Sequence, residues 1–195
     1  MNMQHFWFNI IGHFDDTQIM DFLVKNVPEN GTIAEIGVWR GRSTAYLGVE
    51  ALNSGKNIQI DAIDLWFTPD SGYISPEEFR EKNPEADIYN LAEDSMYVKF
   101  IQNMKDLRNV RPIKMCSWEA ASIYADNSLD AVYIDGDHIY ESVKKDIHAW
   151  YDKVKPGGIL SGHDIFNCLD VPKAVKECFG DSYNTLNTSW WIQKK

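Results

Sequence analysis

Acidic and imidazole side chains follow two successive predicted strands of this chain. Asp135, Asp137 and His138 come directly after one buried apolar run, and His163 and Asp164 come directly after the next. Because the carboxyl ends of parallel strands meet at one edge of an open sheet, we expect these side chains to lie close together. Histidine titrates near neutrality, so the group is suited to a reaction in which a proton is removed from a substrate.

A strand, a helix and a second strand must position this group. Residues 129–135 (LDAVYID) form the first buried run, and residues 159–161 form the second after a turn at residues 155–158 (KPGG). Between them, apolar residues spaced by four, three and four positions predict a helix with one buried face. These residues are Val143, Ile147, Trp150 and Val154.

A glycine bend earlier in the chain predicts the start of an open α/β sheet. A short apolar strand, residues 33–36, leads into Gly37 and Gly41, and a helix-like run follows over residues 43–52. Strand, glycine turn and helix in this order are typical of the first unit of such a sheet. At the bend, a Cβ would keep a flat ligand away from the backbone.

The residues around the bend indicate which ligand it suits. Trp39 and Arg40 stand between the glycines, where a dinucleotide site would have G-x-G-x-x-G, and Glu35 lies just upstream. An acid beside the bend favours a cationic, phosphate-free ligand such as S-adenosylmethionine (SAM). Asp64, near the end of the second predicted strand at residues 57–66, is placed to accept hydrogen bonds from ribose hydroxyls. NAD and SAM both contain a ribose, so Asp64 supports a nucleoside and leaves its identity open.

Two stretches of this sequence resemble a known enzyme family. EIGVWRGRST resembles the first motif of class I SAM-dependent methyltransferases, and its residues are most similar to those of the small-molecule O-methyltransferase branch. DAVYIDGDHIYESVKKDIHAWYDKVKPGGILSGHDI resembles the methyltransferase type 24 family, which is distantly similar to catechol and caffeoyl-CoA O-methyltransferases. The resemblance extends over about residues 33–166. It implies an α/β fold in one domain, residues 1–195, with a Rossmann-like seven-stranded sheet whose last strand is antiparallel.

The resemblance also implies an activity and a cofactor site. The activity is transfer of a methyl group from SAM to a hydroxyl of a small molecule, namely a sugar, a phenol or a natural product. Glu35 and Ser43 are placed for the amino-acid end of SAM, and the loop at Ser117 for the amino group of its adenine. The residues predicted to bind the cofactor are Glu35, Gly37, Trp39, Gly41, Ser43, Asp64, Ser117, Trp118 and Asp135.

In metal-dependent members of this family, acids after the fourth and fifth strands hold a divalent cation. The matching positions here are Asp135, His163 and Asp164, and the place of the catalytic base is His138. A cation would lower the pKa of a bound hydroxyl and orient it. His163 departs from the family's oxygen ligands, and imidazole suits transition ions better than Mg²⁺. The sequence therefore leaves open Mg²⁺, a transition ion, or no metal with His163 as the base.

The composition indicates which kinds of binding partner and which cellular compartment to expect. Of 195 residues, 44% are hydrophobic and 25% charged, as in ordinary globular proteins. The formal net charge of −10 has the wrong sign for holding a phosphate backbone, so we expect no nucleic-acid partner. No apolar run approaches the roughly 20 residues of a membrane span, and the N-terminus lacks a signal-peptide pattern. The three scattered cysteines fit a reducing compartment, so we expect a cytoplasmic protein without a membrane partner. The oligomeric state stays open.

Further elements are predicted around this unit. Asp15 and Asp16 can cap a helix that Pro28 stops. Residues 67–89 interrupt the alternation of strands and helices, and we interpret them as a lid insertion above the ligand edge. The other predicted elements are a helix at residues 91–107, a strand at 111–116 with a loop at 117–119, a helix at 171–179, and closing strands at 183–186 and 189–193.

Two other functions are compatible with a nucleotide-binding fold. An NAD(P)-dependent oxidoreductase would share the ribose acid, but Trp39 and Arg40 between the glycines disfavour it. A catalytically silent interaction module would have lost its polar strand ends, and they are present here. The sequence does not identify the methyl acceptor, and nitrogen acceptors stay open.

Overall fold

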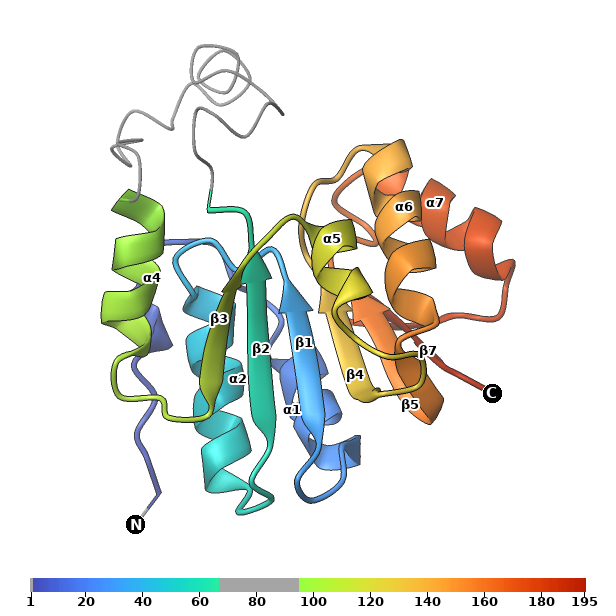
Figure 1. The fold of residues 1–195 in the computed structure, drawn as a ribbon. Helices are drawn as coiled ribbons and strands as arrows, with labels where there is room; N and C mark the ends of the chain where they lie inside the picture. The colour runs from blue at the N-terminus through green and yellow to red at the C-terminus, as the bar shows by residue number, and fades with distance from the viewer. Residues whose placement is uncertain (1, 67–94) are drawn as a thin grey trace.

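Seven strands form one mixed sheet in the order β3-β2-β1-β4-β5-β7-β6 (Figure 1). The computed structural model describes residues 2–66 and 95–195. The five strands from β3 to β5 are parallel, whereas β7 runs antiparallel to both β5 and β6. The strands are β1 (Thr32–Ile36), β2 (Gln59–Asp64), β3 (Val110–Lys114), β4 (Leu129–Ile134), β5 (Val154–Gly162), β6 (Asn184–Leu186) and β7 (Ser189–Gln193). The predicted fold class is confirmed.

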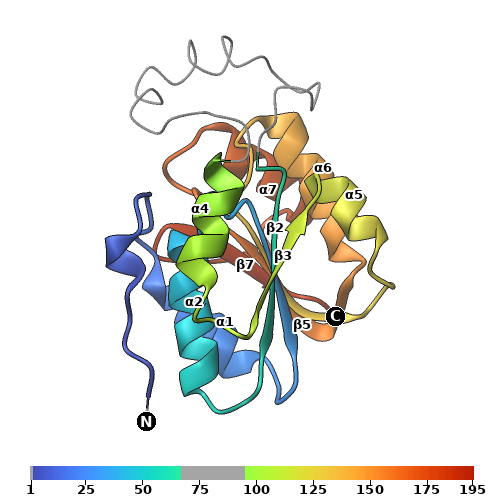
Figure 2. The same ribbon diagram turned by 60° about the vertical axis from the view of Figure 1, so that its left-hand side comes forward.

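Helices cover both faces of this sheet (Figure 2). The helices are η1 (Trp7–Asn9), α1 (Thr17–Asn26), α2 (Arg42–Asn53), α4 (Ser95–Met104), α5 (Ser117–Ser122), α6 (Tyr140–Tyr151) and α7 (Asp170–Phe179). α1, α2 and α4 pack on one face, and α5, α6 and α7 on the other. In the described parts of the chain, no helix has the length and apolar character needed to cross a membrane.

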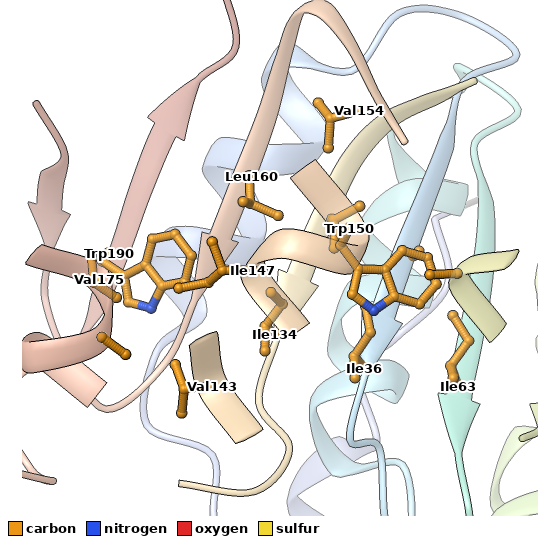
Figure 3. Packing of buried hydrophobic residues seen from close by; sticks show 14 of the residues in the cluster. Ile36, Ile63, Ile134, Val143, Ile147, Trp150, Val154, Leu160, Val175 and Trp190 are labelled. Carbon is orange, nitrogen blue, oxygen red and sulfur yellow. The ribbon is translucent and has the colours of Figure 1, made fainter. Parts of the chain in front are cut away.

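Local signals set the ends of several helices. Asp16 caps α1, because its Oδ1 accepts a hydrogen bond from the Ile19 backbone N–H at 3.2 Å. Gly180 follows α7 with φ +60°, a conformation that stops a helix. The buried face of α6 brings Trp150 against Ile36 and Ile63 beneath the sheet (Figure 3).

Three local predictions are wrong. Residues 155–158 do not form a free turn but belong to β5, because the chain after β7 pairs with them: Gly157 N–H donates to the Lys194 carbonyl at 2.7 Å. Val154 begins β5 instead of ending the helix, although it is buried in the same cluster. Residues 117–119 begin α5 instead of a loop.

The predicted lid at residues 67–89 and the first residues of the predicted helix at 91–107 lie outside the described residues. The described part of that helix is α4.

Candidate active site

A cavity of about 1090 Å³ lies at the carboxyl ends of β1 to β4. Seven residues predicted from the sequence line it: Gly37, Trp39, Asp64, Ser117, Trp118, Asp135 and His138. The structure therefore brings together the glycine bend, the ribose acid, the residues after β3 and the acidic end of β4. A ligand of nucleoside size can touch all four elements.

The glycine bend is needed because β1 and β4 end in close contact. The Gly37 N–H donates to the Ile63 carbonyl at 2.9 Å, and its φ is +82°. A Cβ on Gly37 would stand 2.1 Å from the backbone oxygen of Asp135. Only glycine fits here, and its bare backbone forms part of the cavity wall.

Backbone N–H groups hold Asp64 at the end of β2. Trp39 donates to one carboxylate oxygen and Trp66 to the other, both at 2.7 Å. Burial raises the pKa of Asp64, and these backbone hydrogen bonds oppose the rise. A carboxylate oxygen can accept more than one hydrogen bond, so Asp64 can still accept ribose hydroxyls.

Glu35, Gly41 and Ser43 lie behind the bend and are not among the residues lining the cavity. Glu35 is fully buried, and the Ser43 hydroxyl donates to its Oε1 at 2.5 Å. Its Oε2 has no hydrogen-bond partner among the described residues. Burial raises the pKa of Glu35 to about 7. Gly41 caps α2 with φ +84°, and a Cβ there would meet Met104 at 2.7 Å.

The Ser117 hydroxyl is already tied to α6. Its oxygen accepts a hydrogen bond from the Trp150 indole N–H at 2.8 Å. The neighbouring Trp118 ring lies under the Lys145 ammonium, 3.3 Å from the ring centroid. Both residues line the cavity, as predicted, although they begin a helix.

Several lining residues were not predicted. They are apolar at Leu65, Met115 and Ile139, and polar at Ser142, Asp146, Cys168 and Asp170, among others. Ser142 and Asp146 precede Trp150 at four-residue spacing on α6, so all three share one face of the helix. This spacing could have predicted that Ser142 and Asp146 line the cavity, because it places both polar side chains on the face of α6 that carries the buried Trp150.

The predicted acids and imidazoles do come together. His138 Nε2 lies 2.9 Å from Asp164 Oδ2 and 3.7 Å from Asp135 Oδ1. His163 Nδ1 lies 3.2 Å from Asp164 Oδ1 and 3.7 Å from Asp135 Oδ1. Asp135 and His138 line the cavity, and His163 and Asp164 lie directly beside them. The ligand atoms of Asp135, His163 and Asp164 all lie within 4.8 Å of one another.

Mutual attraction shifts the pKa values in this cluster. Hydrogen bonds from His138 and His163 hold the pKa of Asp164 well below its usual range. Hydrogen bonds to Asp135 and Asp164 raise the pKa of His138 to about 10. Burial acts to lower the pKa of His163, but Asp164, Asp135 and Asp15 together raise it to about 9. The carboxylates of this cluster therefore favour the protonated, positively charged form of both imidazoles.

Two further features hold this cluster in place. Asp164 has φ +58°, an uncommon conformation that is frequent at functional sites. His163 Nε2 lies 2.9 Å from both Asp15 Oδ1 and Thr188 Oγ1, so its Nδ1 faces Asp135 and Asp164. The ring orientation is thus set from its far side.

The sheet order, with its antiparallel β7 and its helices on both faces, is the fold of class I SAM-dependent methyltransferases. Comparison with known proteins agrees, because a family model described as a methyltransferase domain matches residues 34–165. The chain belongs to this methyltransferase family, and the resemblance seen in its sequence is confirmed.

Solved structures show the same fold. The O-methyltransferase NovP is 21% identical, with a TM-score of 0.65 over 91% of this chain and 78% of that chain. CalS11, a TDP-rhamnose 3'-O-methyltransferase of calicheamicin biosynthesis, is 19% identical, with a TM-score of 0.54 over 90% of this chain and 75% of that chain. Among curated proteins, y4gI of Sinorhizobium fredii, an uncharacterised protein, is 30% identical over 105 residues, which are 53% of this chain. This chain covers only 10% of that protein.

Proposed function

We propose that this protein moves a methyl group from SAM to a hydroxyl of a small molecule. The observation that carries the proposal is that one cavity is lined by Gly37 and Asp64, which suit a nucleoside, and by Asp135 and His138, which can exchange a proton. Methyl transfer from a sulfonium is an in-line displacement, so donor and acceptor must share one space. Positioning of this kind contributes on the order of 7–11 kcal/mol in well-aligned cases.

The cavity suits SAM on chemical grounds. Asp64 supplies acceptors for ribose hydroxyls, and the bare backbone at Gly37 is a part of the cavity wall against which a flat ligand can lie. Glu35 lies just behind this bend, and a bound ammonium or sulfonium group would favour its ionised form and be attracted to it. The net charge of −10 favours a cationic donor in the same way and disfavours nucleic acid as the acceptor.

The donors at the acceptor edge also fit a divalent cation. Two carboxylates and one imidazole, from Asp135, Asp164 and His163, have ligand atoms within 4.8 Å of one another. The contact of His163 Nε2 with Asp15 matches the common arrangement in which a carboxylate orients a metal-binding imidazole. A bound cation would lower the pKa of the acceptor hydroxyl and orient it.

We assign removal of the acceptor proton to His138. It lies at the cavity wall beside Asp135 and Asp164, which in the structure keep it in its charged form. The imidazole becomes a proton acceptor when positive charge near these two carboxylates offsets their effect. The incoming sulfonium or a cation supplies such charge. If no cation binds, His163 is the alternative base.

A thermal melt tests the cofactor assignment. A ligand at 100 times its dissociation constant adds about 2.7 kcal/mol of stability, which raises the Tm by roughly 5–11 °C for a chain of this size. We expect S-adenosylhomocysteine (SAH), the demethylated product, to cause this shift and NADH to cause none. A shift with NADH alone would identify an oxidoreductase. No shift with either ligand would favour an interaction module.

Labelled methyl transfer tests the acceptor and the metal. The panel should contain nucleotide sugars, phenols, hydroxylated natural products and amines, each assayed with and without chelator. We expect product with a hydroxyl acceptor and its loss in His138→Gln. Titration calorimetry with Mg²⁺ and Mn²⁺ should show binding that Asp164→Asn removes, and Mn²⁺ should bind more tightly because imidazole takes part. Activity that survives chelation, with no heat of binding, would exclude the metal.

A further inference from the structure

Asp146 is a buried acid that faces the cavity without a full set of partners. Its residue is 4% exposed, and it lies on α6 among the residues that line the cavity. Its Oδ1 has no hydrogen-bond partner among the residues that the structure describes. A buried carboxylate oxygen without a partner is costly, and at a cavity wall a ligand that donates a hydrogen bond would remove this cost.

At this part of the cavity wall, the Asp146 carboxylate lies near a Ser117 hydroxyl that is tied to Trp150. The Trp150 indole, which can only donate, gives its N–H to the Ser117 oxygen at 2.8 Å. The Ser117 hydroxyl also acts to lower the pKa of Asp146. The pKa of Asp146 is raised to about 6, mainly by burial. At neutral pH the wall therefore presents carboxylate oxygen to a ligand, and it selects a ligand that donates.

Gly136 keeps this carboxylate accessible. A Cβ at Gly136 would lie 3.7 Å from Asp146 Oδ2 and 3.9 Å from Ile36, in ordinary van der Waals contact. Gly136 is not among the residues with positive φ, so its backbone does not require glycine. What the missing side chain provides is open space above Asp146.

The sheet order decides which part of the cofactor reaches this wall. β2 carries Asp64 and lies between β1, with the glycine bend, and β3. Glu35 on β1 favours the ammonium end of SAM, so if Asp64 holds the ribose, the base extends the other way, toward β3. Beyond Asp64 on that side come the apolar Leu65 and Met115, and then Ser117 with Asp146. Adenine has apolar faces, which suit Leu65 and Met115, and an exocyclic amine at one edge, which suits the Asp146 carboxylate.

We propose that Asp146 selects adenine, its carboxylate accepting a hydrogen bond from the exocyclic amine of the cofactor. The inference rests on the proposed function, since it takes SAM as the methyl donor. Hypoxanthine carries a carbonyl oxygen at the same place. An acceptor would then face the Asp146 carboxylate, and neither could be satisfied.

The test compares two ligands on three proteins by titration calorimetry. The ligands are SAH and S-inosylhomocysteine, its hypoxanthine analogue. The proteins are wild type, Asp146→Asn and Asp170→Asn. Asp170 also lines the cavity, but it accepts the Tyr140 backbone N–H at 3.3 Å, so its variant controls for loss of one acidic charge.

We expect wild type and Asp170→Asn to prefer SAH by about tenfold or more, because a site built for a donor rejects an analogue that lacks it. In Asp146→Asn the amide can donate to the hypoxanthine carbonyl, so the preference should shrink or reverse. An unchanged preference in Asp146→Asn would overturn the inference while leaving SAM binding intact. Wild type that binds neither ligand would overturn the proposed function as well.

A second measurement applies if Asp146→Asn does not fold, as judged by circular dichroism. Wild type alone is then tested with SAH methylated once or twice on the exocyclic amine. One methyl group leaves one N–H donor, whereas two leave none. A sharp loss of affinity only at the second methyl group supports the inference, and equal binding of all three ligands overturns it.

Discussion

At the scale of single residues, the site depends on groups that are strained or buried. Gly37 after β1 and Asp164 after β5 have positive φ, and Glu35 and Asp146 are buried acids, each with one oxygen that lacks a partner among the described residues. Such features lower stability and are kept where they serve binding or chemistry. Their energetic cost can be measured directly, residue by residue.

Gly37→Ala should disable cofactor binding and destabilise the fold. The added Cβ would stand 2.1 Å from the Asp135 backbone oxygen, and φ is +82°. We expect a loss of more than about 2 kcal/mol in the free energy of unfolding, from overpacking and backbone strain together, and at least about tenfold weaker SAH binding.

Gly55→Ala is the matched control for this change. Gly55 has a similar φ of +71°, but no described atom lies within 4 Å of its Cβ position. Denaturant melts should show a loss of about 1 kcal/mol from backbone strain alone, with unchanged SAH binding. Equal effects of both variants would show that the contact with Asp135 is unimportant.

Glu35 should make stability depend on pH. Its pKa is raised from 4.5 to about 7 in the folded protein, so the folded state binds more protons than the unfolded state between these values. Stability is therefore full below pH 4.5 and falls as pH rises through 7, by roughly 3 kcal/mol. Glu35→Gln cannot ionise, so its stability relative to wild type should increase over the same range.

Denaturant melts from pH 5 to pH 8 measure this difference. Ser43→Ala is the companion variant, because it removes a hydrogen bond that lowers the pKa of Glu35. The fall in stability should then extend to higher pH. A difference between Glu35→Gln and wild type that does not change with pH would contradict the assignment.

At the scale of elements, the patterns with strong periodicity were predicted correctly. The glycine bend, the helix after it and the buried face of α6 follow from local spacing, and the closing strands were predicted where this fold usually ends. The predictions failed where a distant segment decided the outcome. Residues 155–158 look like a turn, but pairing with Lys194 draws them into β5.

The candidate site divides in the same way. Gly37, Asp64 and the polar strand ends are placed by strand order, so their meeting could be predicted. Asp146 was missed because its role depends on Ser117 and Gly136, which come from other segments. That Glu35 and Ser43 lie behind the bend could not be predicted either, because burial depends on how α2 packs against β1.

At the scale of the whole molecule, the net charge of −10 should distinguish SAM from SAH. SAM carries one more positive charge than SAH, since only SAM has a sulfonium. A negatively charged protein therefore attracts SAM more, and salt screens this attraction. We expect the affinity for SAM to fall with ionic strength while that for SAH stays nearly constant. Calorimetry at about 0.01 M and 1 M salt spans Debye lengths of about 30 to 3 Å.

His163 contacts two residues that lie far apart in the sequence. Asp15, 148 positions before it, and Thr188, 25 positions after it, both approach its outer nitrogen. During synthesis on the ribosome, the walls that receive the nucleoside are all translated before β7. The residues that line the cavity are thus all synthesised before Thr188, which orients His163. Competence for chemistry would then arrive last, with the closing strand.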